Sequence, residues 1–278
     1  MLEIPESTTI AGQLNKTLHG KTIYNVIINH SPHKFAFYHG DPAHYTTLLY
    51  GQVIGESVGI GAMIEISAGD RRIVFGDGAN LRYFDRSDKV PTKHQLLLEF
   101  DDRSVLVCSV QMYGTVLAFM EGTLENKYYL MAKEKPLPLA DSFDMTYFNK
   151  LRTVESGQLS AKAYLATQQR IPGLGNGVLQ DILFHAGIHP KRKMGKIDKK
   201  EYIKLFHSVK NTLAEMTSLR GRDTEKDLFG RAGGYKTILS KNTVGKLCPV
   251  CGTAIQKSPY LGGAIYWCPV CQPLQNNT

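Results

Sequence analysis

Four of the five cysteines form two Cys-x-x-Cys pairs near the C-terminus, and this pattern constrains the fold more than any other feature of the sequence. The pairs are Cys248 with Cys251 and Cys268 with Cys271, and sixteen residues separate them. Each short turn can direct two thiolates at one ion, and the segment between is long enough for a β-hairpin that brings the pairs together. We therefore expect a structural Zn²⁺ site with four cysteine ligands. Two dithiol redox pairs or an iron–sulfur centre are the alternatives.

The remaining cysteine and the start of the chain exclude other classes of protein. Five cysteines in 278 residues are too few and too clustered for a disulfide framework. Cys108 lies in an apolar run, so we expect it in a core and not as a nucleophile. No stretch approaches the ~18 apolar residues of a membrane span, and the first residues lack the pattern of a signal peptide. We expect a cytoplasmic protein with no membrane partner.

Charge is distributed unevenly along the chain. The net charge is +8, but residues 1–140 carry 13 basic and 15 acidic side chains, whereas residues 141–278 carry 20 and 10. Such asymmetry is typical of a protein that binds a polyanion with one half, and without an amphipathic or lipidated anchor nucleic acid is favoured over a membrane. A solvated lysine-rich surface is the alternative.

The sequence shows two patterns of hydrophobicity, one typical of strands and one typical of helices, and together they predict an α+β protein. Segments 22–28, 72–75, 96–100 and 105–110 have the β-branched and apolar character of strands, and the last two bracket a turn as a hairpin. Frequent glycines favour a mostly antiparallel sandwich over a regular α/β repeat. Residues 2–18 are a candidate helix before this sheet.

After the prolines of the segment 133–138 the period becomes helical. Tyr202, Phe206 and Val209 begin a series at steps of four and three, and Asp198 with Glu201 resembles a capping box at its start. A shorter helix is predicted from Asn176 onward. We expect residues 218–246, rich in glycine and basic residues, to form a loop.

A glycine-rich turn precedes the shorter helix. Its sequence is Ile171-Pro172-Gly173-Leu174-Gly175-Asn176. Asn176 can cap the helix, and the free amides of a helix N-terminus bind phosphate readily. A plain corner between two helices explains the turn equally well.

The order of these features resembles the formamidopyrimidine-DNA glycosylase and endonuclease VIII family along essentially the whole chain. The resemblance implies an N-terminal β-sandwich domain over residues 1–135, a helix-two-turn-helix domain over 141–240 and a C-terminal zinc finger over 245–278. The motifs that carry it are Glu3, Gly173-Leu174-Gly175-Asn176, Ala186-Gly187-Ile188-His189-Pro190, Gly234-Tyr235 and the cysteine pairs ending in Cys271-Gln272.

The resemblance also implies a function and a set of binding residues. Family members excise damaged bases from double-stranded DNA that they bend, with the damaged base flipped out. Asn176 matches the family's phosphate-binding asparagine, and Lys246 lies before the finger, where relatives carry DNA-contacting residues. Gln111 and Tyr113 fall where the family inserts a wedge into the duplex, although an ordinary strand end is an alternative. We expect a monomer that associates with the nucleoid when bound to damaged or abasic DNA.

The chain departs from the family where the chemistry takes place. The family attacks the sugar with the amine of an N-terminal proline, and this position is Leu2 here. Glu3 and Glu6 match the family's N-terminal acids and are the candidate catalytic residues, because a carboxyl group can protonate the opening sugar or activate water. Glutamate is also an ordinary residue in the first turn of a helix.

Two phosphate-binding side chains of the family are also missing. A lysine of the first domain corresponds to Ala62, and the arginine of the finger corresponds to Gly263. No basic residue lies between Lys34 and Arg71, and Lys257 is the last basic residue of the chain. Three hypotheses follow: a divergent glycosylase with altered or lost lyase activity, a non-catalytic protein that binds damaged DNA, or a zinc-finger protein that binds structured RNA.

Overall fold

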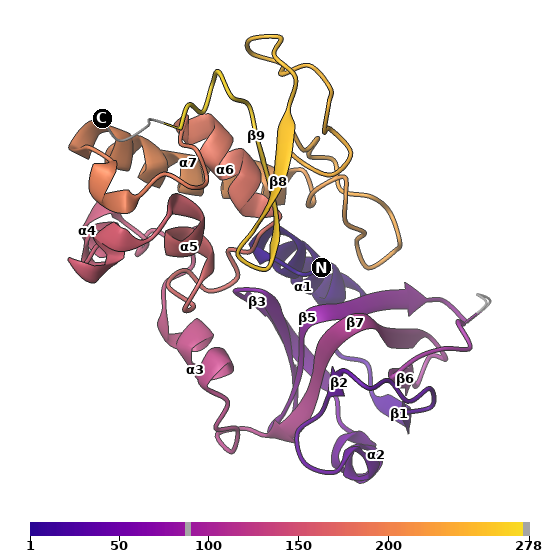
Figure 1. Cartoon of the computed structure of the whole chain (residues 1–278). Helices are drawn as coiled ribbons and strands as arrows, with labels where there is room; N and C mark the ends of the chain where they lie inside the picture. Colours follow the sequence, from indigo (N-terminus) through magenta and orange to yellow (C-terminus); the bar gives the residue numbers. More distant parts are fainter. Residues whose placement is uncertain (87–89, 275–278) are drawn as a thin grey trace. The chain divides into compact units, whose positions relative to one another are not determined.

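The computed structural model describes residues 1–86 and 90–274. The chain forms two compact units (Figure 1). The first unit contains Met1–Leu130 and Arg220–Gly234, and the second contains Met131–Leu219 and the chain from Tyr235 onward. Each unit is described separately below.

The first unit consists of one antiparallel sheet and an N-terminal helix. The order of the main strands is β1-β6-β7-β5-β4-β3, and the short β2 pairs in parallel with β7. The elements are α1 (Ile4–Thr17), β1 (Ile23–Ile28), β2 (Ala36–Phe37), η1 (Pro42–His44), α2 (Tyr45–Leu49), β3 (Ile54–Ile60), β4 (Met63–Ala68), β5 (Arg71–Phe84), β6 (Leu96–Phe100) and β7 (Val105–Met120). The antiparallel domain and the 96–110 hairpin are thereby confirmed.

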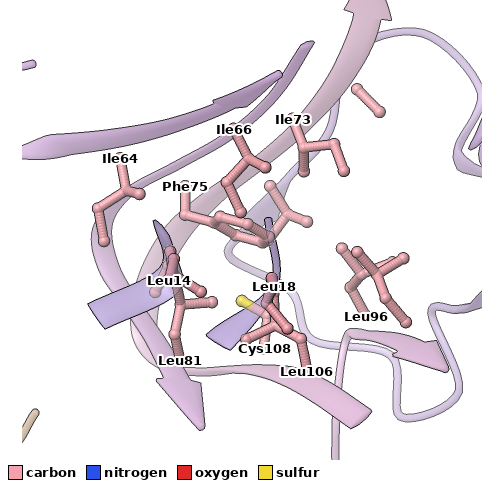
Figure 2. Packing of buried hydrophobic residues seen from close by; sticks show 14 of the residues in the cluster. Leu14, Leu18, Ile64, Ile66, Ile73, Phe75, Leu81, Leu96, Leu106 and Cys108 are labelled. Carbon is pink, nitrogen blue, oxygen red and sulfur yellow. The ribbon is translucent and has the colours of Figure 1, made fainter. Parts of the chain in front are cut away.

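Much of the sheet packs against one large apolar core. Strands β5 and β7 pair along almost their whole length, with a bulge between Asp77 and Ala79. Before the bulge β5 contributes Phe75 to the core, and after it β5 contributes Leu81. Figure 2 shows these two side chains in the same cluster as Cys108. The Cys108 thiol is buried, which raises its pKa to about 12, so its expected place in a core is confirmed.

Helix α1 covers part of this sheet. It begins after Glu3 with Pro5 in its first turn, where a missing N–H costs no hydrogen bond. Its apolar side chains, including Leu14, are buried in the same cluster. Gly59 of β3 allows the close approach, because a Cβ there would lie 2.9 Å from the backbone nitrogen of Thr8. The predicted N-terminal helix is thus confirmed.

The second unit is mainly helical and ends in a β-hairpin. Helix α7 has the predicted capping box, in which the Asp198 side chain accepts from the Glu201 amide and the Glu201 carboxylate accepts from the Asp198 amide. The elements are α4 (Met145–Lys150), η2 (Glu155–Gln158), α5 (Ala161–Ala166), α6 (Val178–Ala186), η3 (Met194–Lys196), α7 (Lys199–Ser218), β8 (Gln256–Tyr260) and β9 (Gly263–Trp267). Helix α3 (Lys127–Glu134) spans the boundary between the units. Of the helices in the described residues, none has the length and apolar character needed to cross a membrane.

The predicted helix cap at Asn176 is wrong. Helix α6 begins two residues later, with Gly177 at the N-cap and no side-chain cap bond. The Asn176 amide is instead bonded to the C-terminal hairpin, because its Nδ2 donates to the carbonyl of Ala264 at 3.0 Å. A tertiary partner has therefore replaced the local one.

The segment after α7 is shared between the units. Residues 220–234 belong to the first unit, although they follow the longest helix of the second. Between Ser218 and Gln256 the structure contains isolated β-bridges but no helix or strand, as the composition of residues 218–246 indicated. The domain ranges 1–135, 141–240 and 245–278 remain a prediction.

Candidate functional site

The four C-terminal cysteines gather at one end of the β8–β9 hairpin. Their sulfur atoms all lie within 4.8 Å of one another. Sγ of Cys248 is 3.8 Å from that of Cys271, and Sγ of Cys251 is 3.3 Å from that of Cys268. The hairpin pairs Gln256 with Trp267, which brings the two turns together as the spacing predicted. Four convergent thiols are a donor set that holds one metal ion.

A buried glutamine ties this cluster to the helical part of the unit. The side-chain oxygen of Gln272 accepts from the Cys268 amide at 3.1 Å, and its Nε2 donates to the Ile188 carbonyl at 2.9 Å. Gln272 is fully buried. Phe184 and Ile255 pack in the same apolar cluster as Cys268. The position of the cysteine turns is therefore fixed by the core of the second unit.

Asn176 lies beside the tip of the hairpin. Its side chain is exposed, and its Oδ1 accepts from Nε2 of the buried Gln180 at 3.3 Å. Oε1 of Gln180 also accepts from the Tyr266 amide of β9. Gln180 thus links the turn that contains Asn176 to the hairpin. The sequence alone did not predict this role. Lys246 is exposed, two residues before the first cysteine turn.

A cavity of about 330 Å³ lies in the first unit. Among the predicted site residues it is lined by Glu6, Gln111 and Tyr113, and Met112 between the last two is 67% exposed. The walls are completed by Met1, Leu2, Ile10, the β5 residues 78–82 and the segment 224–226. Gly78 is required in this wall, because a Cβ there would lie 2.2 Å from the Tyr113 carbonyl oxygen.

Both candidate acids are buried against one arginine. The Nε and Nη2 atoms of Arg222 donate to the two oxygens of Glu6 at 3.0 and 2.8 Å, and the Arg222 amide donates to the first of these oxygens at 3.1 Å. Nη1 of Arg222 is 3.5 Å from a carboxylate oxygen of Glu3. Glu3, Glu6 and Arg222 are each at most 4% exposed. The two carboxylates raise the pKa of Arg222 despite its burial, so the guanidinium stays charged.

The first two residues are also held in place. Leu2 is buried in the core, and its amide donates to the Asp77 carbonyl at 3.1 Å. The α-ammonium group of Met1 forms an ion pair with Glu225. Met1 and Glu225 both line the cavity. The terminal amine is therefore at the cavity wall, next to a carboxylate.

The structure brings some of the predicted residues together and leaves others apart. Glu6, Gln111 and Tyr113 share the cavity of the first unit. Glu3 belongs to the same unit but is not among the residues that line this cavity, and Asn176, Lys246 and the cysteines belong to the second unit. Sequence analysis missed Arg222 and Glu225. Both lie in a segment without periodicity, and only the charged character of residues 218–246 could have pointed to them.

Comparison with known proteins places the chain. A family model described as the formamidopyrimidine-DNA glycosylase H2TH domain matches residues 135–226. A formamidopyrimidine-DNA glycosylase of Prochlorococcus marinus is 31% identical over 198 residues, which are 69% of this chain and 66% of that protein. One from Shouchella clausii is 28% identical over 98% of this chain and 99% of its own length.

Solved structures show the same fold. A complex of Lactococcus lactis Fpg with DNA containing an abasic site has a TM-score of 0.83 at 24% identity, covering 98% of this chain and all of that chain. MutM (Fpg) of Thermus thermophilus has a TM-score of 0.81 at 22% identity, covering 99% of this chain and all of that chain. The chain belongs to the formamidopyrimidine-DNA glycosylase family.

Proposed function

We propose that this protein is a DNA glycosylase of base excision repair that acts on damaged double-stranded DNA. The observation that carries the proposal is the cavity in the first unit, where Glu6, Gln111 and Tyr113 meet the amino terminus. A base cannot be attacked within the stack, so the enzyme extrudes it into a pocket at a cost of about a few kcal/mol. A cavity of about 330 Å³ is in the range of small-ligand sites.

The terminal amine of Met1 is the group best placed to react with the sugar. Attack of the unprotonated amine on C1′ would break the bond between C1′ and the base, and the base would leave with a proton from solvent. Loss of one amine proton and cleavage of the C1′–O4′ bond, with protonation of O4′, would then leave a protonated imine between the protein and the opened sugar. Glu225, paired with this amine, is positioned to accept that proton. Excision by water activated by Glu3 is the other route.

Binding without excision is the second candidate function. The specific observation in its favour is Arg222, which pairs with both Glu3 and Glu6, each of which is only 4% exposed. A general acid must reach the reacting atoms. In this case the cavity would bind a flipped base or an abasic site, and no bond would be broken.

The second unit supplies DNA affinity in either case. Zn²⁺ held by Cys248, Cys251, Cys268 and Cys271 would be structural, because four protein ligands leave no position for water. The excess of basic residues after residue 140 supplies attraction to phosphates, with Asn176 and Lys246 as contacts. A monomer acting on the genome belongs in the cytoplasm, at the nucleoid.

The test combines base release with covalent trapping on one set of duplexes. Duplexes with an oxidised base, an abasic site or no lesion are incubated with protein, with and without borohydride. A trapped adduct that peptide mapping places on Met1 supports attack by the terminal amine. Base release without an adduct supports excision by an activated water molecule. Absence of both, with tighter binding to the abasic duplex than to the intact one, leaves binding alone.

Two controls complete this experiment. Chemical blocking of the α-amine should abolish the adduct if Met1 is the nucleophile, and an adduct that persists would assign it to a lysine. Competition between duplex DNA and structured RNA at fixed salt tests the nucleic acid itself. Preference for RNA would overturn the proposed function.

A further inference from the structure

Two phenylalanine rings of the first unit are exposed on the short strand β2 and the residue before it. Phe35 and Phe37 are 47% and 52% exposed, whereas the residues that alternate with them, Ala36 and Tyr38, pack against the core. Successive side chains of an extended segment point to opposite sides, so both rings point away from the core. Single exposed apolar residues are common, but neighbouring ones indicate a binding surface.

The pairing of β2 with β7 places these rings next to the predicted wedge residues. Figure 1 shows β2 alongside β7, and the two strands are parallel. The Gly114 amide of β7 donates to the Phe35 carbonyl at 2.9 Å. Met112 and Tyr113, which come directly before Gly114, are exposed and line the cavity. The exposed apolar surface beside the cavity therefore extends from β7 onto residues 35–37.

A cation accompanies this aromatic surface. Lys34 is exposed, and its Nζ lies 5.4 Å from the centre of the Phe35 ring. The ring of His33 lies 6.4 Å from that of Phe35. Proteins that bind unpaired nucleic acid combine aromatic rings, on which bases stack, with cations that attract the backbone. The chemistry of the surface therefore favours nucleic-acid bases over an apolar protein segment.

We propose that Phe35 and Phe37 form a stacking surface for unpaired DNA bases next to the lesion. This inference rests on the proposed function and extends it, because the cavity accepts one flipped nucleotide and the stacking surface binds others that have lost their partners. Stacking tolerates any sequence, since every base has a flat aromatic face. The protein should therefore prefer lesions within a bubble or a single-stranded region to lesions within a fully paired duplex.

Two duplexes with the same lesion test this preference. Both contain a central tetrahydrofuran site, and in one of them the bases around the site are mismatched. We expect tighter binding to the mismatched duplex. The double variant Phe35→Ala with Phe37→Ala should bind it about tenfold more weakly, as expected for the loss of one stacked base, and should bind the paired duplex as before. The matched control is Tyr50→Ala, which removes an exposed ring at the end of α2.

A photochemical cross-link locates the unpaired bases. On irradiation, 5-iodouracil in the mismatched strand should cross-link to the ring on which it stacks. Peptide mapping should then place the cross-link between His33 and Phe37. A cross-link confined to Tyr113 would overturn the proposal, because the unpaired bases would then meet only the predicted wedge.

The outcomes separate this surface from the proposed function. If the unmutated protein binds neither duplex, the proposed function fails. If it binds both equally well, or if the double variant keeps the preference for the mismatched duplex, the stacking surface is refuted. An equal loss of affinity for both duplexes also refutes it, because the rings would then act without regard to pairing.

A milder variant keeps the test decisive if circular dichroism shows that the double variant does not fold. Phe37→Leu removes the flat ring and keeps an apolar side chain of similar size. Loss of the preference for the mismatched duplex in this variant supports the stacking surface, and an unchanged preference refutes it. Unchanged DNA binding together with altered sedimentation would assign the rings to a contact between copies of the chain, which also refutes it.

Discussion

At the scale of single residues, the buried charge of Arg222 is compensated within its own unit. Arg222 has two carboxylate partners, Glu3 and Glu6. A buried ion pair is weak evidence for net stability, but removal of one partner leaves an uncompensated charge. The burial of all three side chains therefore indicates a structural role for Arg222.

Arg222→Gln should destabilise the first unit strongly. We expect a loss of about 3–5 kcal/mol in the free energy of unfolding, because two buried carboxylates lose their cation. Denaturant unfolding measures it, with Arg220→Gln, an exposed arginine of the same segment, as the control. The double variant Glu6→Gln with Arg222→Gln should recover part of the loss, and strict additivity would show that the pair is not coupled.

His189 should make the second unit sensitive to acid. Burial and the nearby Lys191 lower its pKa to about 4, and its Nδ1 accepts from the Lys191 amide at 3.0 Å. Because the unfolded chain then binds more protons between about pH 6.5 and 4, the contribution is complete above 6.5 and is lost as pH falls towards 4, by on the order of 2–3 kcal/mol.

Trp267 provides the readout for this titration. Its ring lies 5.1 Å from that of His189, and it is the only tryptophan of the chain. Unfolding followed by its fluorescence at several pH values should show a smaller pH dependence in His189→Gln. An identical dependence in both proteins would remove His189 as the cause.

At the scale of elements, the β8–β9 hairpin depends on groups outside itself. Its cysteine turns are bonded through Gln272 to the loop after α6, and its strand β9 is bonded to Gln180. A two-stranded hairpin is marginally stable alone. We expect the proposed metal ion and these two glutamines to stabilise it jointly.

Cys268→Ser should release the metal and unfold the hairpin, because metal coordination contributes folding free energy in such modules. Metal analysis and proteolysis of the C-terminal segment measure the two effects. Cys108→Ser is the matched control, since this cysteine lies in the core of the other unit and should leave the metal content unchanged. Absence of zinc from the unmutated protein would contradict the assignment.

At the scale of the whole molecule, charge and chemistry belong to different units. The cavity and the amino terminus lie in the first unit, whereas the cysteine cluster, Asn176 and Lys246 lie in the second. Phosphate contacts fix position without reading sequence. The second unit should therefore determine affinity for any duplex, and the first should determine preference for damage.

Asn176→Ala separates these contributions. We expect about tenfold weaker binding to every duplex, intact or damaged, because one hydrogen bond to a charged phosphate is lost. The slope of log K against log[salt] should stay unchanged because asparagine is neutral. Fluorescence anisotropy at several salt concentrations measures both quantities. Selective weakening for the damaged duplex alone would place Asn176 in lesion recognition.

The sequence by itself determined the features that depend on short spacing. The Cys-x-x-Cys pairs predicted the thiol cluster, the 198–201 pattern predicted the start of α7, and two apolar runs around a turn predicted the hairpin at 96–110. These signals are local, because a turn or a helix start is fixed by residues within a few positions of one another.

Only the tertiary structure decided which distant groups meet. Arg222 reaches Glu6 across 216 positions and Asn176 reaches Ala264 across 88, so the assignment of a capping role to Asn176 failed although its local pattern was sound. The sequence likewise did not show that Glu3 and Glu6, the candidate catalytic residues, both pair with Arg222, because Arg222 lies in a segment without periodicity. Pairing between buried polar groups depends on the packed fold, and periodicity along a chain carries no information about it.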